Sequence, residues 1–334
     1  MTEPLLSACL IVKDEEANLP RCLASIRGLH DDLVVVDTGS TDATISIARD
    51  FGARVFEVPW RNDFAWARNV SLDHGLGQWL MPLDADDELV DTDIAETRAR
   101  LASGDLDSDV LLGKNRLRYA GGREMTLLAP RLIRRASGFR YTHAVHEQLD
   151  TPPGTPAGVS NLTFLHHGYL TREMLERKER RNLAIAETMP PSAHAMHCVL
   201  RSAFFLGDWR RTVATAMELA ALSDANVTLR EDACALGAAA SVSVKDPSAL
   251  THFLSVGQAL SPDNPDLRLM GVIAALFRYV HTLKDGDSTE GGQHYVRPWL
   301  YWHDKSFAQA VLGTLLGGTA RESSTDGTGE ETTP

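Results

Sequence analysis

Residues 33–42 read Leu-Val-Val-Val-Asp-Thr-Gly-Ser-Thr-Asp, and this stretch decides the fold class. Its first four residues form an uninterrupted apolar run, which is typical of a parallel strand covered on both faces. The polar half is rich in residues that cap helices, and it predicts a helix that runs to about Phe51 and stops at Gly52. A strand that leads through a polar turn into a helix is the repeating unit of an α/β sheet.

The same alternation continues on both sides of this stretch. Apolar runs predict strands at 6–12, 54–58 and 78–83, and helical spacing of apolar residues predicts helices at 15–27 and 63–74. Since proline has no N–H group, pairing on one side of the last of these strands should fail at Pro82.

The pattern changes after about residue 109. Strand candidates at 110–118, 125–134 and 162–166 follow without clear crossover helices, which predicts a mixed sheet. After Thr171 the sequence turns helical, and short polar turns separate Ala-rich amphipathic stretches. These stretches are 192–206, 209–222, 229–244, 248–260 and 265–283.

Paired helices with short turns indicate a helical-hairpin region. The expected organisation is therefore an α/β domain over 1–170 and an all-α region over 171–316. A tail over 317–334 is rich in Gly, Ser, Thr and Glu and should be disordered. The Ala-rich helices could also supply the interface of a homodimer.

Composition excludes several classes of function. The 334 residues include 33 Lys and Arg against 45 Asp and Glu, a formal net charge of −12. A surface of that sign repels nucleic acids and anionic lipids, so neither is an expected partner. Four cysteines without a Cys-x-x-Cys pair argue against disulfide scaffolds and structural zinc. No signal-like start and no membrane-spanning apolar run are found, so we expect a cytoplasmic protein.

Asp84-Ala85-Asp86 follows an apolar strand and is the strongest local feature. Two carboxylates one residue apart can share a hard divalent cation such as Mg²⁺ or Mn²⁺. The carboxyl ends of the strands are also where open α/β sheets bind ligands. The alternative is an acidic, helix-capping turn on the surface.

Two further residues suit a nucleotide. Asp37 ends its strand and can accept a hydrogen bond from the N3–H of a uracil, and Arg68 offers a planar fork that can pair with a diphosphate. The alternatives are a strand-to-helix turn capped by Ser40 or Thr41, and a solvated helix charge at Arg68.

Six segments in register resemble the family 2 glycosyltransferases, which have the GT-A fold. They are IVKDEEANL at 11–19, VVVDTGSTD at 34–42, PWRNDFAWARN at 59–69, LDADD at 83–87, VHEQL at 145–149 and HHGY at 166–169. The subgroup they resemble joins the catalytic domain to tetratricopeptide-like helices and includes the peptide S-glycosyltransferases of bacterial glycocins. One departure is Asp14, where the family often has Asn.

The resemblance implies a metal-dependent, inverting transfer of a sugar from a nucleotide diphosphate, with UDP the expected nucleotide. The acceptor would be a peptide or a natural product. Asp37 would bind uracil, and Glu15 would lie near the uridine. Arg68 would face the nucleotide or its diphosphate. Asp84 would lie near the ribose and the metal.

The resemblance also implies a metal site and a base. Asp86 would bind Mn²⁺ or Mg²⁺ directly, and His166 would complete the site, with His167 as the second candidate. Glu147 is the first candidate for the base that accepts the proton of the acceptor, and His146 is the second. The alternatives are strand-end histidines without a metal, and a loop anchored by a salt bridge from Glu147 to an arginine such as Arg131 or Arg134.

Two other classes of function compete with this hypothesis. A sugar-nucleotide nucleotidyltransferase would need a Gly-rich, basic loop after the first strand, whereas residues 13–16 are Lys-Asp-Glu-Glu. A non-catalytic scaffold would use the helices alone to bind a protein. The aromatic residues of the helical half could stack on an acceptor or could fill a helical core; they are Trp209, Trp299, Tyr301 and Trp302.

Overall fold

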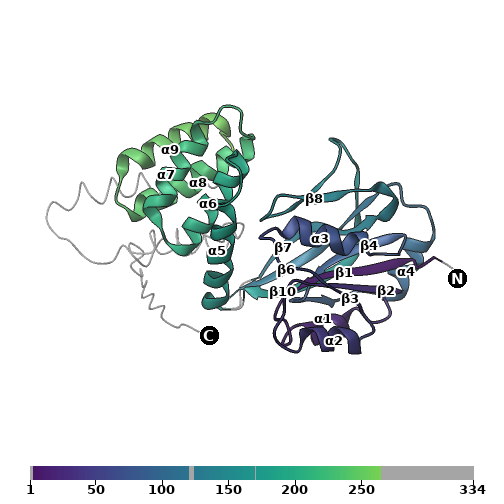
Figure 1. The fold of residues 1–334 in the computed structure, drawn as a ribbon. Coiled ribbons are helices and arrows are strands. Elements are labelled where there is room, and N and C mark those ends of the chain that lie inside the picture. The colour runs from purple at the N-terminus through teal and green to yellow at the C-terminus, as the bar shows by residue number, and fades with distance from the viewer. Residues whose placement is uncertain (1–2, 120–123, 170, 265–334) are drawn as a thin grey trace, which may run out of the picture. The chain divides into compact units, whose positions relative to one another are not determined.

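The computed structural model describes residues 3–119, 124–169 and 171–264 (Figure 1). The first part of the chain builds strands and short helices. In order these are β1 (Leu6–Val12), α1 (Leu19–Ser25), β2 (Asp32–Asp37), α2 (Thr44–Asp50), β3 (Arg54–Glu57), α3 (Phe64–Asp73), β4 (Trp79–Asp84), β5 (Asp87–Val90), α4 (Ile94–Ala102), β6 (Val110–Tyr119), β7 (Glu124–Arg134), β8 (Arg140–Thr142), β9 (Gln148–Asp150) and β10 (Ala157–Tyr169). Five helices follow: α5 (Arg172–Ala186), α6 (Ala193–Leu206), α7 (Trp209–Ala221), α8 (Val227–Ser243) and α9 (Pro247–Leu260).

Eight strands form one mixed sheet in the order β3-β2-β1-β4-β7-β6-β10-β5. The strands β1 to β4 run parallel to one another, whereas β7 is antiparallel to both β4 and β6. At the far edge β10 runs parallel to β6 and antiparallel to β5. The predicted mixed sheet, followed by an all-α region, is confirmed.

The parallel strands are covered on both faces, as the apolar run of β2 predicts. In β1, Leu6, Ala8 and Leu10 pack with the apolar residues of α1, while Cys9 packs with Leu72 of α3 on the opposite face. This alternation follows the two-residue period of a strand. Figure 1 shows α1 and α2 on one face of this half of the sheet and α3 on the other.

Pro82 limits pairing in β4 as predicted. The register of β4 with β1 continues from Trp79 to Asp84, but its register with β7 covers only Trp79 and Leu80. The pairing of β4 with β7 therefore ends before Asp84. The carboxyl end of β4 is left unpaired on that side, next to the segments that build the site.

Four of these helices and strands were not predicted, namely α4, β5, β8 and β9, and the start of one helix was predicted too early. The helix expected at 15–27 begins at Leu19, since residues 15–18 form a turn. Helix α4 begins after Asp93, whose side chain accepts a hydrogen bond from the backbone N–H of Glu96. That pair is a capping signal which could have revealed the helix. Strand β5 has four residues, and its partner β10 lies far along the chain.

The helices α5 to α9 form antiparallel hairpins in which each helix packs against the next. All five begin at a side chain that accepts a hydrogen bond from a backbone N–H two or three residues ahead; the caps are Thr171, Ser192, Asp208, Asn226 and Asp246. The predicted helical hairpins are thus present. The predicted helix at 265–283, the predicted tail at 317–334 and the aromatic residues after 298 lie outside the described residues.

The boundary expected at residue 170 stays a prediction. Strand β10 ends at Tyr169 and α5 begins at Arg172, yet the sheet and the described helices belong to one compact unit. Within the described part of the chain, no helix combines the length and the apolar character needed to cross a membrane.

Candidate active site

The three residues predicted to hold a metal lie together at the carboxyl end of β4. Asp84 is the last residue of β4, and Asp86 lies in the turn that leads to β5. His166 reaches this turn because β10 pairs with β5 in a register that sets it opposite Asp87. Potential ligand atoms of Asp84, Asp86 and His166 all lie within 4.8 Å of one another.

Asp87 orients His166 within this cluster. The Nδ1 atom of His166 lies 2.9 Å from Asp87 Oδ1, and Arg131 Nη1 donates a hydrogen bond to Asp87 Oδ2 at 2.8 Å. Burial opposes ionisation of Asp87, but the charge of Arg131 and the hydrogen bond from His166 hold its pKa well below the ordinary value. Nδ1 therefore donates to Asp87, and Nε2 lies on the other side of the ring, 3.3 Å from Lys178 Nζ. Neither Asp87 nor Arg131 was predicted as a part of this site.

The same hydrogen bond affects the charge of the imidazole. Burial disfavours the protonated form of His166, yet the hydrogen bond with Asp87 and the charge of Asp86 raise its pKa above the ordinary value. His167 has a different acidic partner: its Nε2 atom lies 2.8 Å from Glu88 Oε2. The cluster of possible ligands includes His166 and not its neighbour.

Gly168 and Lys178 complete the surroundings of the cluster. Lys178 of α5 places its Nζ atom 3.2 Å from Asp86 Oδ2 and 3.3 Å from His166 Nε2. A Cβ atom at position 168 would lie closer than 3.0 Å to each of these three atoms. Glycine therefore keeps open the small space that they surround. Lys178 was not found by the sequence analysis, because it lies in the helical half.

Arg68 of α3 forms hydrogen bonds with two acidic residues for which different roles were predicted, Asp84 near the metal and Glu147 as the base. Its Nη2 atom donates to Asp84 Oδ1 at 3.0 Å and to Glu147 Oε1 at 2.8 Å, and its Nε atom donates to the same Glu147 oxygen at 3.1 Å. Burial lowers the pKa of Arg68, but the charges of Asp84 and Glu147 raise it well above the ordinary value. The guanidinium also lies over the ring of Tyr141, at 5.3 Å. Arg68 is thus no solvated helix charge.

The salt bridge of Glu147 differs from the alternative expected for it. Arg131 pairs with Asp87, and Arg134 pairs with Asp109, so the expected partners are wrong. The partner is Arg68, which lies in α3 and faces the metal cluster through Asp84. Glu147 is therefore linked to the cluster by a single side chain.

Asp37 ends β2 in the position predicted for it. Its Oδ1 atom accepts hydrogen bonds from the backbone N–H groups of Gly39 and Ser40, both at 2.9 Å. Its Oδ2 atom is buried and has no hydrogen-bond partner within the described residues. The expected capping of the next helix by Ser40 or Thr41 is wrong, since α2 begins only at Thr44 and has no side-chain cap.

Asp14 and Glu15 lie in the turn after β1 and connect it to the segment after β2. Asp14 Oδ1 accepts hydrogen bonds from the backbone N–H of Thr41 at 2.7 Å and from its hydroxyl at 3.2 Å. Asp14 thus ties the turn after β1 to the turn after β2. Burial raises the pKa of Glu15, and the charges of Asp86 and Asp84 raise it further, so Glu15 lies beside the acidic cluster.

Comparisons with known proteins agree with this geometry. Residues 7–158 match the sequence family named Glycosyl transferase family 2. This segment is a family 2 glycosyltransferase domain. A TPR repeat-containing protein of Synechococcus elongatus is 37% identical over 145 residues, which are 43% of this chain and 35% of the relative. The glycosyltransferase SunS of Bacillus subtilis is 26% identical over 196 residues, which are 56% of this chain and 45% of the relative.

The chain therefore spans less than half the length of these curated relatives. Among solved structures, residues 1–349 of S. aureus TarS in complex with UDP resemble this chain, with a TM-score of 0.41 and 15% identity. The match covers 86% of this chain and 95% of that one.

The second base candidate of the glycosyltransferase domain occupies an unusual backbone conformation. His146 has a φ of 53°, in the left-handed region. Its Nε2 atom is buried and has no hydrogen-bond partner among the described residues. Burial lowers the pKa of His146 to about 3, with a further contribution from the charge of Arg201. The imidazole is therefore neutral at physiological pH.

The loop that carries both base candidates packs on the helical region. Val145 belongs to an apolar cluster with Ile185 of α5 and Cys198 of α6. The Nε2 atom of His194 lies 3.1 Å from the carbonyl oxygen of Val145. The helices thus support the position of Glu147 in the glycosyltransferase domain.

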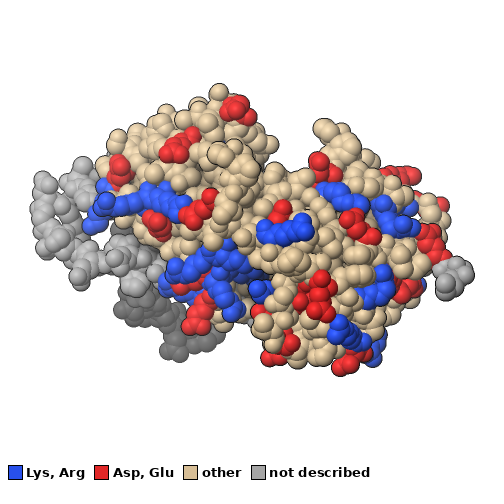
Figure 2. Space-filling model, viewed as in Figure 1, with Lys and Arg blue, Asp and Glu red and all other residues tan. Residues whose placement is uncertain are grey.

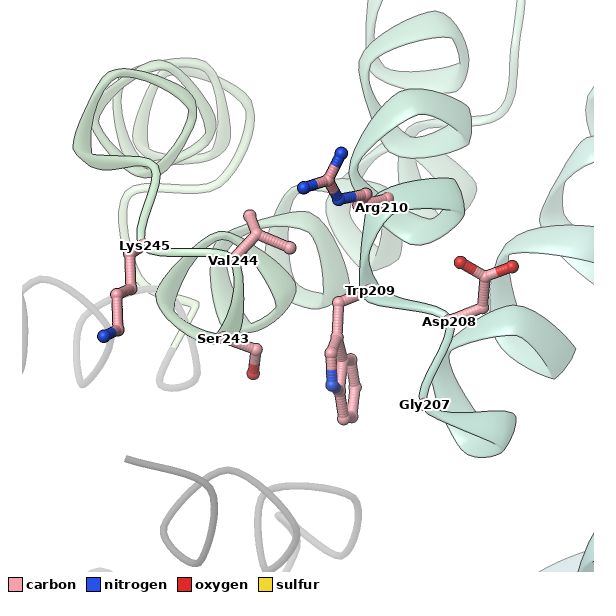
Figure 3. Close-up of a pocket in the computed structure, with 7 residues that line it drawn as sticks. All are labelled: Gly207, Asp208, Trp209, Arg210, Ser243, Val244 and Lys245. Carbon is pink, nitrogen blue, oxygen red and sulfur yellow. The ribbon is translucent and has the colours of Figure 1, made fainter. Parts of the chain in front are cut away.

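A separate cavity of about 420 Å³ lies in the helical region (Figure 3). Its lining comes from the turn between α6 and α7 and from the end of α8; the residues are Gly207, Asp208, Trp209, Arg210, Ser243, Val244 and Lys245. Trp209 lines this cavity and also packs edge-on against Phe204, with 5.4 Å between ring centroids. The lining contains none of the other residues predicted for the site.

Proposed function

We propose that this chain is a metal-dependent, inverting glycosyltransferase that moves a sugar from a UDP-sugar to a peptide or natural-product acceptor. One observation carries the proposal: Asp84, Asp86 and His166 converge at the carboxyl end of β4 in a family 2 glycosyltransferase domain. Convergence of two carboxylates and an oriented imidazole from strands far apart in the sequence is unusual for a surface turn.

The residues present fit a divalent ion. Two carboxylates and one neutral imidazole nitrogen suit Mn²⁺ and are acceptable for Mg²⁺. Gly168 leaves space beside Asp86 Oδ2 and His166 Nε2 that any side chain at this position would fill. Such an ion, when bound, supplies positive charge beside the departing diphosphate.

The nucleotide would lie along the carboxyl ends of β1, β2 and β4. Asp37 Oδ2 is a buried acceptor without a partner in the described structure, and the imide N–H of a uracil is a donor of the right kind. Glu15 would adjoin the nucleotide on the side of the acidic cluster, whose charges from Asp86 and Asp84 reach it. Arg68 holds Asp84 in place and offers charge toward the diphosphate.

Glu147 would act as the base. Both hydrogen bonds from Arg68 use Oε1, which leaves Oε2 to accept the proton of the acceptor. As this proton moves to Glu147, the nucleophile bonds to the anomeric carbon, and the bond from that carbon to the diphosphate oxygen breaks. The product has inverted anomeric configuration, and UDP leaves. His146 is the alternative base because its imidazole is neutral, and a thiol acceptor would need less help from either residue.

Donor turnover tests this proposal. The purified protein is incubated with UDP-, GDP- and TDP-sugars and Mn²⁺ or Mg²⁺, and release of free nucleotide is measured. Slow hydrolysis of one UDP-sugar is expected, and both EDTA and Asp86→Ala should abolish it. Glu88→Gln is the matched control, because Glu88 lies in the same segment but pairs with His167.

The outcomes separate the hypotheses. If UDP binds but no hydrolysis occurs, a panel of peptide and thiol acceptors is added, and Glu147→Gln should then reduce transfer while leaving UDP binding intact. If neither hydrolysis nor UDP binding is detected by calorimetry with metal present, the UDP-sugar proposal is wrong. A helical scaffold that binds a protein would then be the better hypothesis.

A further inference from the structure

Lys178 lies against two of the three residues of the ligand cluster, Asp86 and His166. Its Nζ atom lies 3.2 Å from Asp86 Oδ2 and 3.3 Å from His166 Nε2, both of them groups that would bind a divalent ion. Nε2 is the ring nitrogen that faces Lys178, because Nδ1 is turned toward Asp87. The ammonium group thus contacts the same oxygen and nitrogen atoms that a metal would need as ligands.

A lysine and a divalent ion cannot share this position. The N–H groups of the ammonium use the lone pairs that the metal would need, and two cations a few ångströms apart repel each other. The space is small, since a single Cβ atom at position 168 would collide with Lys178 Nζ, Asp86 Oδ2 and His166 Nε2 together. The ion can bind all its ligands only after the ammonium group has moved.

The structure allows such a movement of the side chain without a movement of the helix. Glu179 of α5 accepts a buried hydrogen bond from the hydroxyl of Ser202 at 2.8 Å, and Ile185 packs against Val145. These contacts hold α5 at Glu179 and Ile185, on the C-terminal side of Lys178. The Lys178 side chain is 27% exposed, so its flexible stem has room to leave the cluster.

We propose that Lys178 is a resident cation that a divalent ion must displace, and that the displaced ammonium group then binds the diphosphate of the donor. This inference rests on the proposed function. Helix α5 has a net positive charge in a chain of net charge −12, which suits an anionic ligand. Its three acidic residues, Glu173, Glu176 and Glu179, are outnumbered by five basic ones: Arg172, Arg177, Lys178, Arg180 and Arg181. Figure 2 shows Lys and Arg side chains gathered over this helix.

Mn²⁺ binding without nucleotide is the decisive measurement. Electron paramagnetic resonance of free Mn²⁺ yields the dissociation constants of the wild type and of Lys178→Met. The variant should bind Mn²⁺ about tenfold more tightly, because no like charge competes for the ligands. Arg177→Met is the matched control: it removes the same charge from the adjacent, exposed position of α5 and should leave the Mn²⁺ affinity unchanged. Lys178→Gln is the second variant if Lys178→Met fails to fold.

UDP binding tests the second part of the proposal, that the displaced ammonium group of Lys178 binds the diphosphate. In saturating Mn²⁺, Lys178→Met should bind UDP about tenfold more weakly than the wild type, since it lacks one charge on the diphosphate. Tighter metal and weaker nucleotide binding in one variant would support a lysine that exchanges ligands. A lysine with a merely structural role would weaken both.

The possible failures are distinguishable. If the wild type binds Mn²⁺ in an Asp86-dependent way but Lys178→Met binds it equally or more weakly, this inference is wrong and the proposed function stands. If no variant binds Mn²⁺, with or without UDP, both the inference and the metal-dependent function are wrong.

Discussion

His166 donates a hydrogen bond from Nδ1 to Asp87 Oδ1 across the antiparallel pair of β5 and β10, at 2.9 Å. The carboxylates of the acidic motif at the end of β4 therefore have different roles. Asp84 and Asp86 face the space where an ion would bind, whereas Asp87 is fully buried and holds both the imidazole and Arg131. Orientation of a ligand by a carboxylate behind it is a general feature of metal sites.

Replacing Asp87 by Asn should therefore impair both metal binding and stability. The Mn²⁺ affinity should fall roughly 10- to 100-fold, because His166 loses its charged partner. The free energy of unfolding should fall by about 3–5 kcal/mol, because Arg131 is left buried without a counter-charge. Urea unfolding and Mn²⁺ titration measure the two effects. Asp91→Asn, at an exposed ion pair with Arg116, should change stability by less than about 1 kcal/mol. Equal effects of the two variants would refute the special role of Asp87.

Replacing Gly168 by Ala should block the ligand cluster. The added methyl group would occupy the space between Asp86 Oδ2 and His166 Nε2, so Mn²⁺ affinity should fall at least about tenfold. The flexible end of Lys178 can move aside, but Asp86 and His166 are buried and must also shift, so the thermal midpoint should fall as well. Calorimetric titration with Mn²⁺ and a thermal melt test this pair of expectations. Wild-type Mn²⁺ affinity in the variant would show that no ion binds at this point.

Asp37→Asn should weaken nucleotide binding and leave metal binding intact. The amide retains an oxygen for the N–H groups of Gly39 and Ser40 but sets an NH₂ group where the free carboxylate oxygen was. A donor would then face the N3–H donor of uracil, at a cost of about 1–3 kcal/mol, or roughly tenfold or more in UDP affinity. UDP binding by calorimetry in the presence of Mn²⁺ measures this loss. Unchanged UDP affinity would place the base of the nucleotide elsewhere.

The buried imidazole of His146 should make the protein less stable in mild acid. Its pKa is lowered to about 3, whereas an unfolded chain has a histidine pKa of about 6.5. As the pH falls below 6.5, the unfolded state takes up a proton that the folded state does not, so stability decreases. The slope from this residue is at most about 1.4 kcal/mol per pH unit.

His146→Asn should flatten the dependence of stability on pH between 6.5 and 5, and Asn tolerates the left-handed backbone at this position. Urea midpoints across that range test the expectation. His30 and His194, whose pKa values burial also lowers, should keep a residual slope. His252→Asn, at an exposed position of α9, is the control. Identical slopes for His146→Asn and the wild type would show that His146 accepts a proton in the folded state.

Local patterns predicted most of the individual elements. The apolar runs of β1, β2 and β4 and the capped helices α5 to α9 were found because burial and capping leave signals within a few residues of sequence. The short strand β5 left no such signal, since four residues of mixed polarity become a strand only through pairing with β10. Helix α4 did leave a capping signal at Asp93, which was overlooked.

The sequence by itself determined the α/β and helical halves of the chain and the side chains with suitable chemistry, among them Asp37, Asp86 and His166. Only the tertiary structure decided their partners. Asp87 and His166 are 79 residues apart, and Lys178 lies 92 residues from Asp86. Periodicity reports which face of an element is buried, but contacts over such separations depend on strand order and register, which no local pattern encodes. The lysine in the ligand cluster and the arginine between Asp84 and Glu147 are consequences of that register.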